Sequence, residues 1–355
     1  MKNLMKLRIL LLMLIVSSAM ILGSCTKDDD DDIVSGDKTA LNALITEADA
    51  LANAATTADY PQTAIDNYKG TLQTVKNAAA TPITQEQINN LVVQLTEAMD
   101  TFDAQAYGYI DESLYLNAGW HFDEGTGTTA TDYSSLNHVA TFFPGNAGVF
   151  GVDAMSPSWV SGVKGGNAVY LNKGAHLEVP YTTSFLPVDI TISVWIKPIE
   201  LYENNYIISQ NYWNGYKLQT QGGGKPFFTY KKVDGGIIDA DNETDNSITA
   251  NQWNQVVITL NGTTKELKFY VNGTLTKTWT EANKGIGPLI QTLTSPNPQP
   301  FIIGCVATDA ELATWTWTES PTSLGYFKGA IDELKIYNIA LVEGQIMKLY
   351  NDEKP

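Results

Sequence analysis

Arginine is almost absent from this chain of 355 residues, because Arg8 is the only one, and acidic side chains outnumber lysine and arginine by 39 to 22. A guanidinium group provides the forked pair of donors that best holds a phosphate, and the formal net charge of −17 repels polyanions. The same charge disfavours direct contact with anionic membrane surfaces. The composition therefore excludes nucleic acid as a partner and favours neutral ligands.

Histidine and cysteine are also scarce, with three histidines and two cysteines in the chain. No pair among His121, His138 and His176 has a spacing typical of zinc sites, and no Gly-x-Ser-x-Gly segment is present. Cys305 lies in an apolar run and is predicted to be a small buried side chain without a reactive role. The usual signatures of zinc and serine hydrolases are therefore missing.

Residues 1–24 have the features of a bacterial export signal, with a basic start, an unbroken apolar run and then small residues. The segment Leu22-Gly23-Ser24-Cys25 resembles a lipobox, whose cysteine receives the lipid, and an acidic run follows it over 28–32. This order is similar to that of surface lipoproteins of the Bacteroidetes. We therefore expect a signal peptide over 1–24, a lipidated Cys25 that starts an acidic tether over 25–37, and a surface-exposed lipoprotein of the outer membrane.

Hydrophobic residues recur with helical spacing in three stretches between residues 38 and 108. Thr84 and Gln87 have the spacing of a capping box at the start of the third stretch. Amphipathic helices with short connectors can bury their apolar stripes only against each other, so a three-helix bundle is predicted over 38–108. The pattern resembles the small helical module called "found in various architectures" (FIVAR), and its expected role is a spacer.

From residue 109 to residue 355 the pattern changes to short strands separated by turns. Apolar and polar side chains alternate over 190–197, so one face of this strand is predicted to build the core and the other to be partly open. The dipeptides Asn214-Gly215, Asn261-Gly262 and Asn272-Gly273 are typical of hairpins, because both residues accept positive φ. Many short strands at this spacing predict a two-layer β-sandwich.

Four segments, at 190–198, 251–260, 267–273 and 327–338, have the order and spacing of strands in laminin-G-like domains. The last one is similar to the closing strand of the concanavalin A-like lectin and glucanase jelly roll. The resemblance covers about residues 114–350 and implies a mainly β fold, a concanavalin A-like jelly-roll β-sandwich preceded by the small three-helix bundle. Domains of this family bind sugars and proteins more often than they catalyse, and fold alone does not settle function.

The resemblance also implies one structural calcium ion, because many of these jelly rolls hold one where the first and last strands meet. The matching carboxylates are Asp123 and Asp332, with Asp132 as a weaker addition. Carboxylate and carbonyl oxygens are the ligands that calcium prefers. The acidic run 239–245 is a different case, since Thr244 stands where a calcium-binding EF-hand loop needs glycine, and the run is predicted to be a solvated hairpin tip.

Aromatic side chains next to short polar ones are the sequence feature that points to a ligand. Sugars present flat CH-rich faces ringed by hydroxyl groups, so a sugar site needs an exposed aromatic platform beside hydrogen-bonding groups. Trp195 and Trp253 are expected in the core. The candidate carbohydrate-binding residues are Trp159, Tyr212, Trp213, Trp315 and Trp317.

The sequence favours a non-catalytic, cell-surface glycan-binding lipoprotein whose partners are a polysaccharide, the outer-membrane lipid and glycan-uptake proteins. Two other functions stay open. A glycoside hydrolase or polysaccharide lyase needs two carboxylates that converge from distant positions, since the catalytic Glu-x-Asp-x-x-Glu strand of related glucanases does not occur. A protein-binding adhesion or scaffold domain would present Trp315 and Trp317 in a flat apolar patch without a groove.

Overall fold

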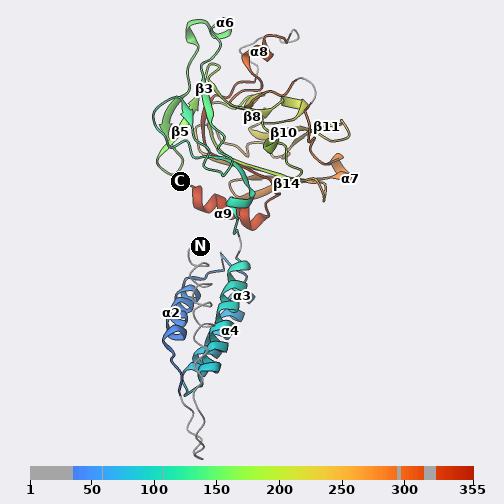
Figure 1. Ribbon diagram of the computed structural model, residues 1–355. Coiled ribbons are helices and arrows are strands. Elements are labelled where there is room, and N and C mark those ends of the chain that lie inside the picture. The colour runs from blue at the N-terminus through green and yellow to red at the C-terminus, as the bar shows by residue number, and fades with distance from the viewer. Residues whose placement is uncertain (1–34, 58, 107, 294–296, 316–324) are drawn as a thin grey trace, which may run out of the picture. The chain divides into compact units, whose positions relative to one another are not determined.

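The computed structural model describes residues 35–355 except for 58, 107, 294–296 and 316–324. The described chain forms two compact units that divide between residues 109 and 110, a helical unit and a β unit (Figure 1). None of the described helices is long and apolar enough to cross a membrane. The predicted lipidation site, Cys25, lies outside the described residues.

The helical unit consists of α2 (Thr39–Ala54), α3 (Gln62–Ala79) and α4 (Gln85–Ala104). Their apolar stripes form one core, in which the ring of Phe102 stacks on those of Tyr60 and Tyr68. The predicted capping box is confirmed, because Thr84 accepts a hydrogen bond from the backbone of Gln87 and the Gln87 side chain accepts one from the backbone of Thr84. The sequence prediction of three packed helices before the β-sandwich is confirmed.

The β unit is a sandwich of two antiparallel sheets, each with eight strands (Figure 1). The first sheet has the order β14 (Thr274–Thr280), β13 (Glu266–Val271), β12 (Asn254–Asn261), β7 (Ile190–Pro198), β16 (Gly329–Tyr337), β5 (Asn167–Leu171) and β4 (Ser158–Ser161), and β1 (Leu116–Trp120) also pairs with β16. The second has the order β11 (Ile237–Asp241), β10 (Lys225–Lys231), β9 (Tyr216–Gln221), β8 (Asn205–Gln210), β15 (Phe301–Ile303), β6 (His176–Val179), β3 (Ala140–Phe143) and β2 (Thr129–Ala130).

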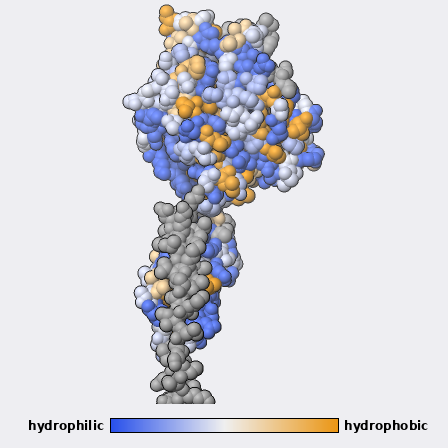
Figure 2. Space-filling view, viewed as in Figure 1, coloured by the Kyte–Doolittle hydropathy of each residue, from blue (hydrophilic) through white to orange (hydrophobic). Residues whose placement is uncertain are grey.

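Short helices complete the connections of the sandwich. The α-helices are α5 (Glu112–Tyr115), α6 (Ala147–Phe150), α7 (Glu281–Lys284), α8 (Asp309–Leu312) and α9 (Glu343–Glu353), and the 3-10 helices are η1 (Gly151–Asp153), η2 (Thr183–Phe185) and η3 (Tyr212–Asn214). The β13–β14 connection is a two-residue hairpin in which Asn272 and Gly273 both have positive φ, as their sequence predicts. In Figure 2, apolar residues on the visible face of the sandwich are scattered among polar ones, as is normal for a surface in water.

The core lies between the sheets, and β7 shows how the sequence builds it. Ile192 and Val194 point inward and are fully buried, as the alternation predicts. The opposite face of β7 is not partly open as predicted, because α9 covers it and the Trp195 ring stacks on Tyr350 at 5.8 Å between centroids. Trp253, expected in the core, is partly exposed directly before β12.

A buried ion pair holds α9 against the first sheet. The ammonium group of Lys335 on β16 lies 2.7 Å from Oε1 of Glu353 and also contacts Glu333. The other oxygen of Glu353 accepts a hydrogen bond of 2.8 Å from the indole nitrogen of Trp195. Because Lys335 and Glu353 are 4% and 6% exposed, water screens this pair little.

Candidate functional site

Three aromatic rings from two distant segments meet at one end of the sandwich. Tyr212 and Trp213 belong to η3, and Trp315 follows α8. The ring of Trp213 lies 4.4 Å from that of Tyr212 and 5.3 Å from that of Trp315, and the Tyr212 and Trp315 rings meet edge to face. Tyr212 is buried, whereas both indoles are partly exposed. Three of the predicted sugar-binding residues therefore form one cluster, which we call the aromatic cluster.

A carboxylate on α8 fixes this cluster. The Oε1 atom of Glu311 accepts a hydrogen bond of 2.8 Å from the Tyr212 hydroxyl and one of 3.4 Å from the Trp315 indole nitrogen. Burial, together with the bond to Glu311, raises the pKa of Tyr212 above its usual range, so the phenol stays protonated and keeps donating. Thr308 caps α8 by accepting from the backbone of Glu311. The sequence analysis missed Glu311, because no local pattern distinguishes it from a solvated acid.

The aromatic cluster rests on the outer face of the second sheet. Tyr206 on β8 and Ile302 on β15 pack in the same group of side chains as Tyr212, whereas their neighbours Phe301 and Ile303 point into the sandwich core. Cys305 is fully buried in this group, as predicted. Burial raises the pKa of its thiol well above its usual range, which leaves it unreactive.

Polar and aromatic side chains continue across this face from β8 to β10. The ammonium group of Lys217 lies 4.9 Å from the ring centre of Tyr206 and 5.2 Å from that of Phe227. It donates a hydrogen bond of 2.6 Å to Oε1 of Gln219. Burial lowers the pKa of Lys217 to about 8, because removing the ammonium from water disfavours the charged form.

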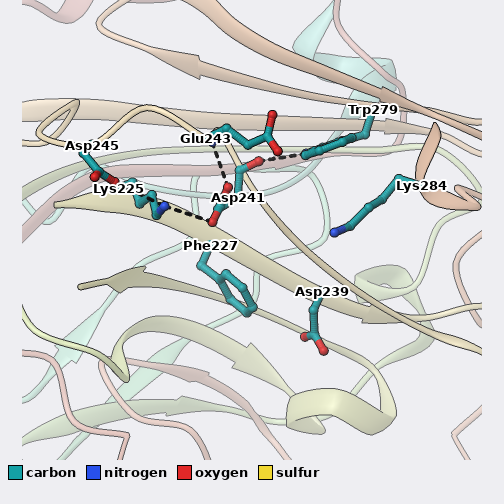
Figure 3. A pocket seen from close by; sticks show the side chains of 8 residues that line it. All are labelled: Lys225, Phe227, Asp239, Asp241, Glu243, Asp245, Trp279 and Lys284. Atoms are coloured by element: carbon teal, nitrogen blue, oxygen red, sulfur yellow. Dashed lines mark hydrogen bonds and ion pairs between the residues drawn. The ribbon is translucent and has the colours of Figure 1, made fainter. Parts of the chain in front are cut away.

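A cavity of about 450 Å³ lies where this face meets β11 and β14 (Figure 3). It is lined by Lys225, Phe227, Asp239, Asp241, Glu243, Asp245, Trp279 and Lys284. Lys225 pairs with Asp241 at 3.3 Å and with Asp245 at 3.2 Å. The acidic run is mostly exposed, as predicted for a solvated tip, and it also forms one wall of this cavity, where Lys225 from the neighbouring strand pairs with it.

Of the other two predicted sugar-binding residues the structure describes only Trp159, which is not part of the aromatic cluster. Trp159 on β4 packs against Phe142, with 5.0 Å between ring centres, and its indole nitrogen donates to the carbonyl oxygen of Gly127 at 3.2 Å. Trp317 lies outside the described residues. The contacts of Trp159 attach it to the sandwich core rather than to the group around Tyr206.

The predicted calcium ligands Asp123 and Asp332 line one pocket of about 300 Å³, together with His121, Lys164, Gly165, Gly166 and Glu333. The two oxygens of Asp332 accept backbone hydrogen bonds from Val163 at 2.7 Å and from Glu333 at 2.9 Å. Burial nevertheless raises the pKa of Asp332 to about 7. Asp123 accepts a hydrogen bond from the backbone of Asn167.

Asp132 does not line this pocket and has a different role. Its carboxylate accepts hydrogen bonds from the backbone nitrogens of Gly119, Ser134 and His138 and from the Ser134 hydroxyl, at 2.6 to 2.8 Å. A carboxylate has roughly four lone-pair sites, so these donors use its whole capacity. Asp132 therefore holds the turn after β2 against β1. Among the described residues no group of three or more His, Cys, Asp or Glu side chains is placed to bind a metal ion.

We expect the sandwich to lose roughly 1 kcal/mol of unfolding free energy between pH 6.5 and 8. The hydrogen bond to Glu333 raises the pKa of His121, and burial raises that of Asp332 to about 7. A raised pKa means that the folded state holds its proton more tightly than the unfolded state, so the stabilisation fades as pH rises. Burial lowers the pKa of His138 and lowers that of Lys217 to about 8, so these two groups act in the opposite direction and make the net loss smaller.

Urea titrations of the protein at four pH values in this range measure the slope. The Asp332→Asn variant should show a flatter dependence on pH, whatever its absolute stability. A wild-type stability that rises toward pH 8 would contradict the assignment.

Comparison with known protein families agrees with the fold described above. Residues 171–347 match a family model described as the concanavalin A-like lectin/glucanases superfamily. The sandwich has the concanavalin A-like fold that the sequence predicts. No curated protein matches the chain.

Solved structures with a similar fold include one sugar-bound domain and two toxin domains. Domain 4 of AbnA, an extracellular arabinanase of family GH43 from Geobacillus stearothermophilus solved with arabinotriose, is 19% identical with a TM-score of 0.47, over 67% of this chain and 100% of that one. The binding domain of Paraclostridial Mosquitocidal Protein 1 is 20% identical (TM-score 0.42; 67% and 52% covered). The binding domain of botulinum neurotoxin DC in complex with SialylT is 17% identical (TM-score 0.46; 69% and 52% covered). The match spans about half the length of the two toxin domains.

Proposed function

We propose that the β-sandwich binds carbohydrate without cleaving it, with the aromatic cluster as its platform. The observation that carries this proposal is the pair of partly exposed indoles, Trp213 and Trp315, with ring centres 5.3 Å apart and planes tilted by 39°. Two such rings present a bent apolar surface on which the CH-rich faces of successive sugar units can stack. Glu311, at the edge of the rings, supplies an acceptor for sugar hydroxyl groups.

The affinity of one such site should be modest. A shallow platform with few fixed hydrogen bonds corresponds to micromolar to millimolar dissociation constants, or roughly 4–8 kcal/mol. Weak single sites suit a protein that holds a repeating polymer, because several copies on a cell surface engage one chain and the avidity rises.

A glycoside hydrolase is the second candidate, and one observation favours it. Asp309 on α8 is half-buried near Glu178 on β6, and burial together with the charge of Glu178 raises the pKa of Asp309. Its Oδ1 atom is buried and accepts no hydrogen bond from the described residues. A carboxyl group with a raised pKa close to a second carboxyl group is the arrangement of a glycosidase. Sustained release of reducing ends by the wild type, lost in Asp309→Asn, would establish the enzyme and end the non-catalytic proposal.

A library of immobilised polysaccharides and oligosaccharides, screened with the purified protein, tests the binding proposal directly. We expect at least one glycan to bind reversibly and without turnover. Absence of binding across neutral and acidic glycans would end the proposal.

The same screen repeated with a chelator tests the calcium ion, which stays a prediction. Asp123 and Asp332 are the carboxylates that would contact it. A calcium ion there would screen the repulsion between them and stabilise the adjacent hairpin. We expect the chelator to lower the melting temperature of the wild type more than that of Asp332→Asn. Equal melting temperatures with and without chelator would show that no calcium ion stabilises the protein.

We further propose that the protein is displayed on the outer membrane through Cys25, with the helical unit as spacer and glycan-uptake proteins as neighbours. The support is the order of export signal, lipobox and acidic run in the sequence. Surface proteolysis of intact cells, compared between wild type and Cys25→Ala, tests it. A wild-type protein that resists protease until the cells are opened would contradict surface display.

A further inference from the structure

A third cavity, of about 300 Å³, has a chemistry that differs from the rest of this acidic chain. It is lined by Phe150, Lys173, Tyr326 and Lys328, which come from α6, the β5–β6 turn and the segment that leads into β16. Two ammonium groups and two aromatic rings face one space, and no acidic side chain is among its described lining residues. The formal net charge of the chain is −17, so such a local excess of positive charge is unusual here.

The aromatic wall of the cavity is firmly held. The rings of Phe150 and Tyr326 meet edge to face, with 5.2 Å between centres, and Tyr326 is 4% exposed. Phe150 lies directly on the β5–β6 turn, because a Cβ atom added to Gly174 would come within 2.6 Å of its ring. Only glycine therefore fits at position 174, and the Phe150 ring is in close contact with the turn.

Lys173 is presented to the cavity from an uncommon backbone conformation. Its φ is +50°, in the left-handed region that residues other than glycine, asparagine and aspartate rarely adopt. The Asn172 side chain supports this conformation by accepting a hydrogen bond of 2.8 Å from the Lys173 backbone nitrogen. The ammonium group of Lys173 forms no ion pair with any residue that the structure describes. Because Lys173 is exposed to solvent, its charge is available to a ligand that enters the cavity.

Lys328 is neutralised and fixed, in contrast to Lys173. Its ammonium group pairs with Glu200 and lies 4.4 Å from the ring centre of Tyr202. The pair leaves Lys328 able to donate a further hydrogen bond while contributing little net charge. The cavity therefore carries about one positive charge, from Lys173, beside one positioned donor, from Lys328.

The cavity and the aromatic cluster share one group of packed side chains. Tyr326 belongs to the same group of packed side chains as Tyr212, and Phe150, Trp213 and Trp315 all pack against that group. Figure 1 shows α6 and α8 at the same end of the sandwich. A saccharide chain stacked on the indoles can therefore place a neighbouring unit at the cavity.

We infer that this cavity binds the anionic group of an acidic sugar, a carboxylate or a sulfate, on the Lys173 and Lys328 ammonium groups, with Phe150 and Tyr326 against the sugar ring. This inference rests on the proposed glycan-binding function and names its ligand class. The overall composition favours a neutral ligand. An anionic group in the cavity is nevertheless expected to bind, because nearby ammonium groups act on it more strongly than distant acidic side chains, whose charges are screened by salt. A carboxylate and a sulfate would contact the two ammonium groups in the same way, and the probes of the experiment below distinguish them.

The test uses four probes with the whole protein: an oligogalacturonide, the same oligosaccharide with its carboxyl groups reduced to alcohols, a sulfated oligosaccharide and its desulfated form. We expect at least one acidic form to bind about tenfold more tightly than its neutral counterpart, since hydrogen bonds to charged groups are the stronger ones. The Lys173→Gln variant should lose most of that ratio and keep the affinity for the neutral form.

Lys268→Gln is the matched control. Lys268 lies on β13, three strands from β16 in the first sheet, and forms a partly exposed pair with Glu266. This substitution removes the same charge from the same sandwich and should leave the ratio unchanged, and Lys173→Arg should retain it. Melting temperatures of all variants exclude loss of folding as the cause.

The outcomes separate this inference from the function on which it rests. Equal affinity for the acidic and neutral forms, with binding lost in Trp315→Ala, would overturn the basic cavity and leave glycan binding in place. Equal loss of the ratio in Lys173→Gln and Lys268→Gln would also overturn it, by showing a general charge effect. No binding of any saccharide would overturn both.

Discussion

Replacing Trp315 with alanine is expected to weaken glycan binding by about 30-fold, which corresponds to roughly 2 kcal/mol for a central aromatic residue of a binding surface. The indole loses its stacking contact with the sugar, and Glu311 loses one of its two described hydrogen-bond donors in the cluster. Titration calorimetry or affinity electrophoresis with a glycan from the library screen measures the change. The combined replacement of Trp213 and Trp315 should bring binding below detection.

Trp159→Ala provides the matched control, because it makes the same chemical change on β4, where the ring packs on Phe142. It should leave the glycan affinity within about twofold. Trp213→Phe keeps an aromatic ring in the cluster, so it should fold normally and retain part of the binding. An equal loss of affinity in Trp159→Ala and Trp315→Ala would show that the aromatic cluster is not the platform.

Replacing Lys335 with methionine is expected to cost about 3–5 kcal/mol of unfolding free energy, the usual effect of removing one partner from a buried ion pair. Glu353, which is only 6% exposed, would then be buried without its cation, and Glu333 would lose its contact with Lys335. Lys335 and His121 hold the pKa of Glu333 at about 2, against the opposing effect of burial, so its charge depends on these partners. Urea unfolding followed by tryptophan fluorescence measures the cost.

Two further variants test the reason for that cost. The double replacement of Lys335 by methionine and Glu353 by glutamine removes both charges and should recover part of the lost stability. Lys348→Met removes an exposed pair with Asp352 on the solvent side of α9 and should cost less than about 1 kcal/mol. Similar costs for Lys335→Met and Lys348→Met would show that the buried pair does not hold α9.

Local chemistry explains what the sequence predicts well. The alternation along β7, the capping box at Thr84 and the Asn272-Gly273 hairpin each depend on residues within a few positions of one another. The helix α9 was not predicted, and the covered face of Trp195 could not be, because both depend on contacts between β7 and a segment far along the chain. Local patterns therefore predict the helices, the strands and the strand faces that build the core. They do not predict which outer faces of the sheets are covered by distant segments.

The candidate site shows the same division. The aromatic residues Tyr212, Trp213 and Trp315 were predicted from their polar neighbours, and the structure brings them together. Sequence reasoning missed their carboxylate partner Glu311, because its partner Tyr212 lies 99 positions away. It also missed the basic cavity at Lys173, which depends on distant segments and on a backbone angle. The carboxylate of Asp132 was read as a metal ligand because a turn-capping aspartate and a calcium-binding one look alike in sequence.

The hydrogen bonds between β1 and β16 have a consequence for how the sandwich is made. Trp120 pairs with Leu334, and β16 also pairs with β5 and β7. Three strands, β1, β5 and β7, therefore lack a hydrogen-bonding neighbour until β16 has been synthesised. Until then their edges offer unpaired amides and carbonyls to any other extended chain. Closure of such distant contacts is slow. We therefore expect the nascent sandwich to be prone to aggregation during this interval, and overproduction at high concentration should yield aggregates before it yields native protein.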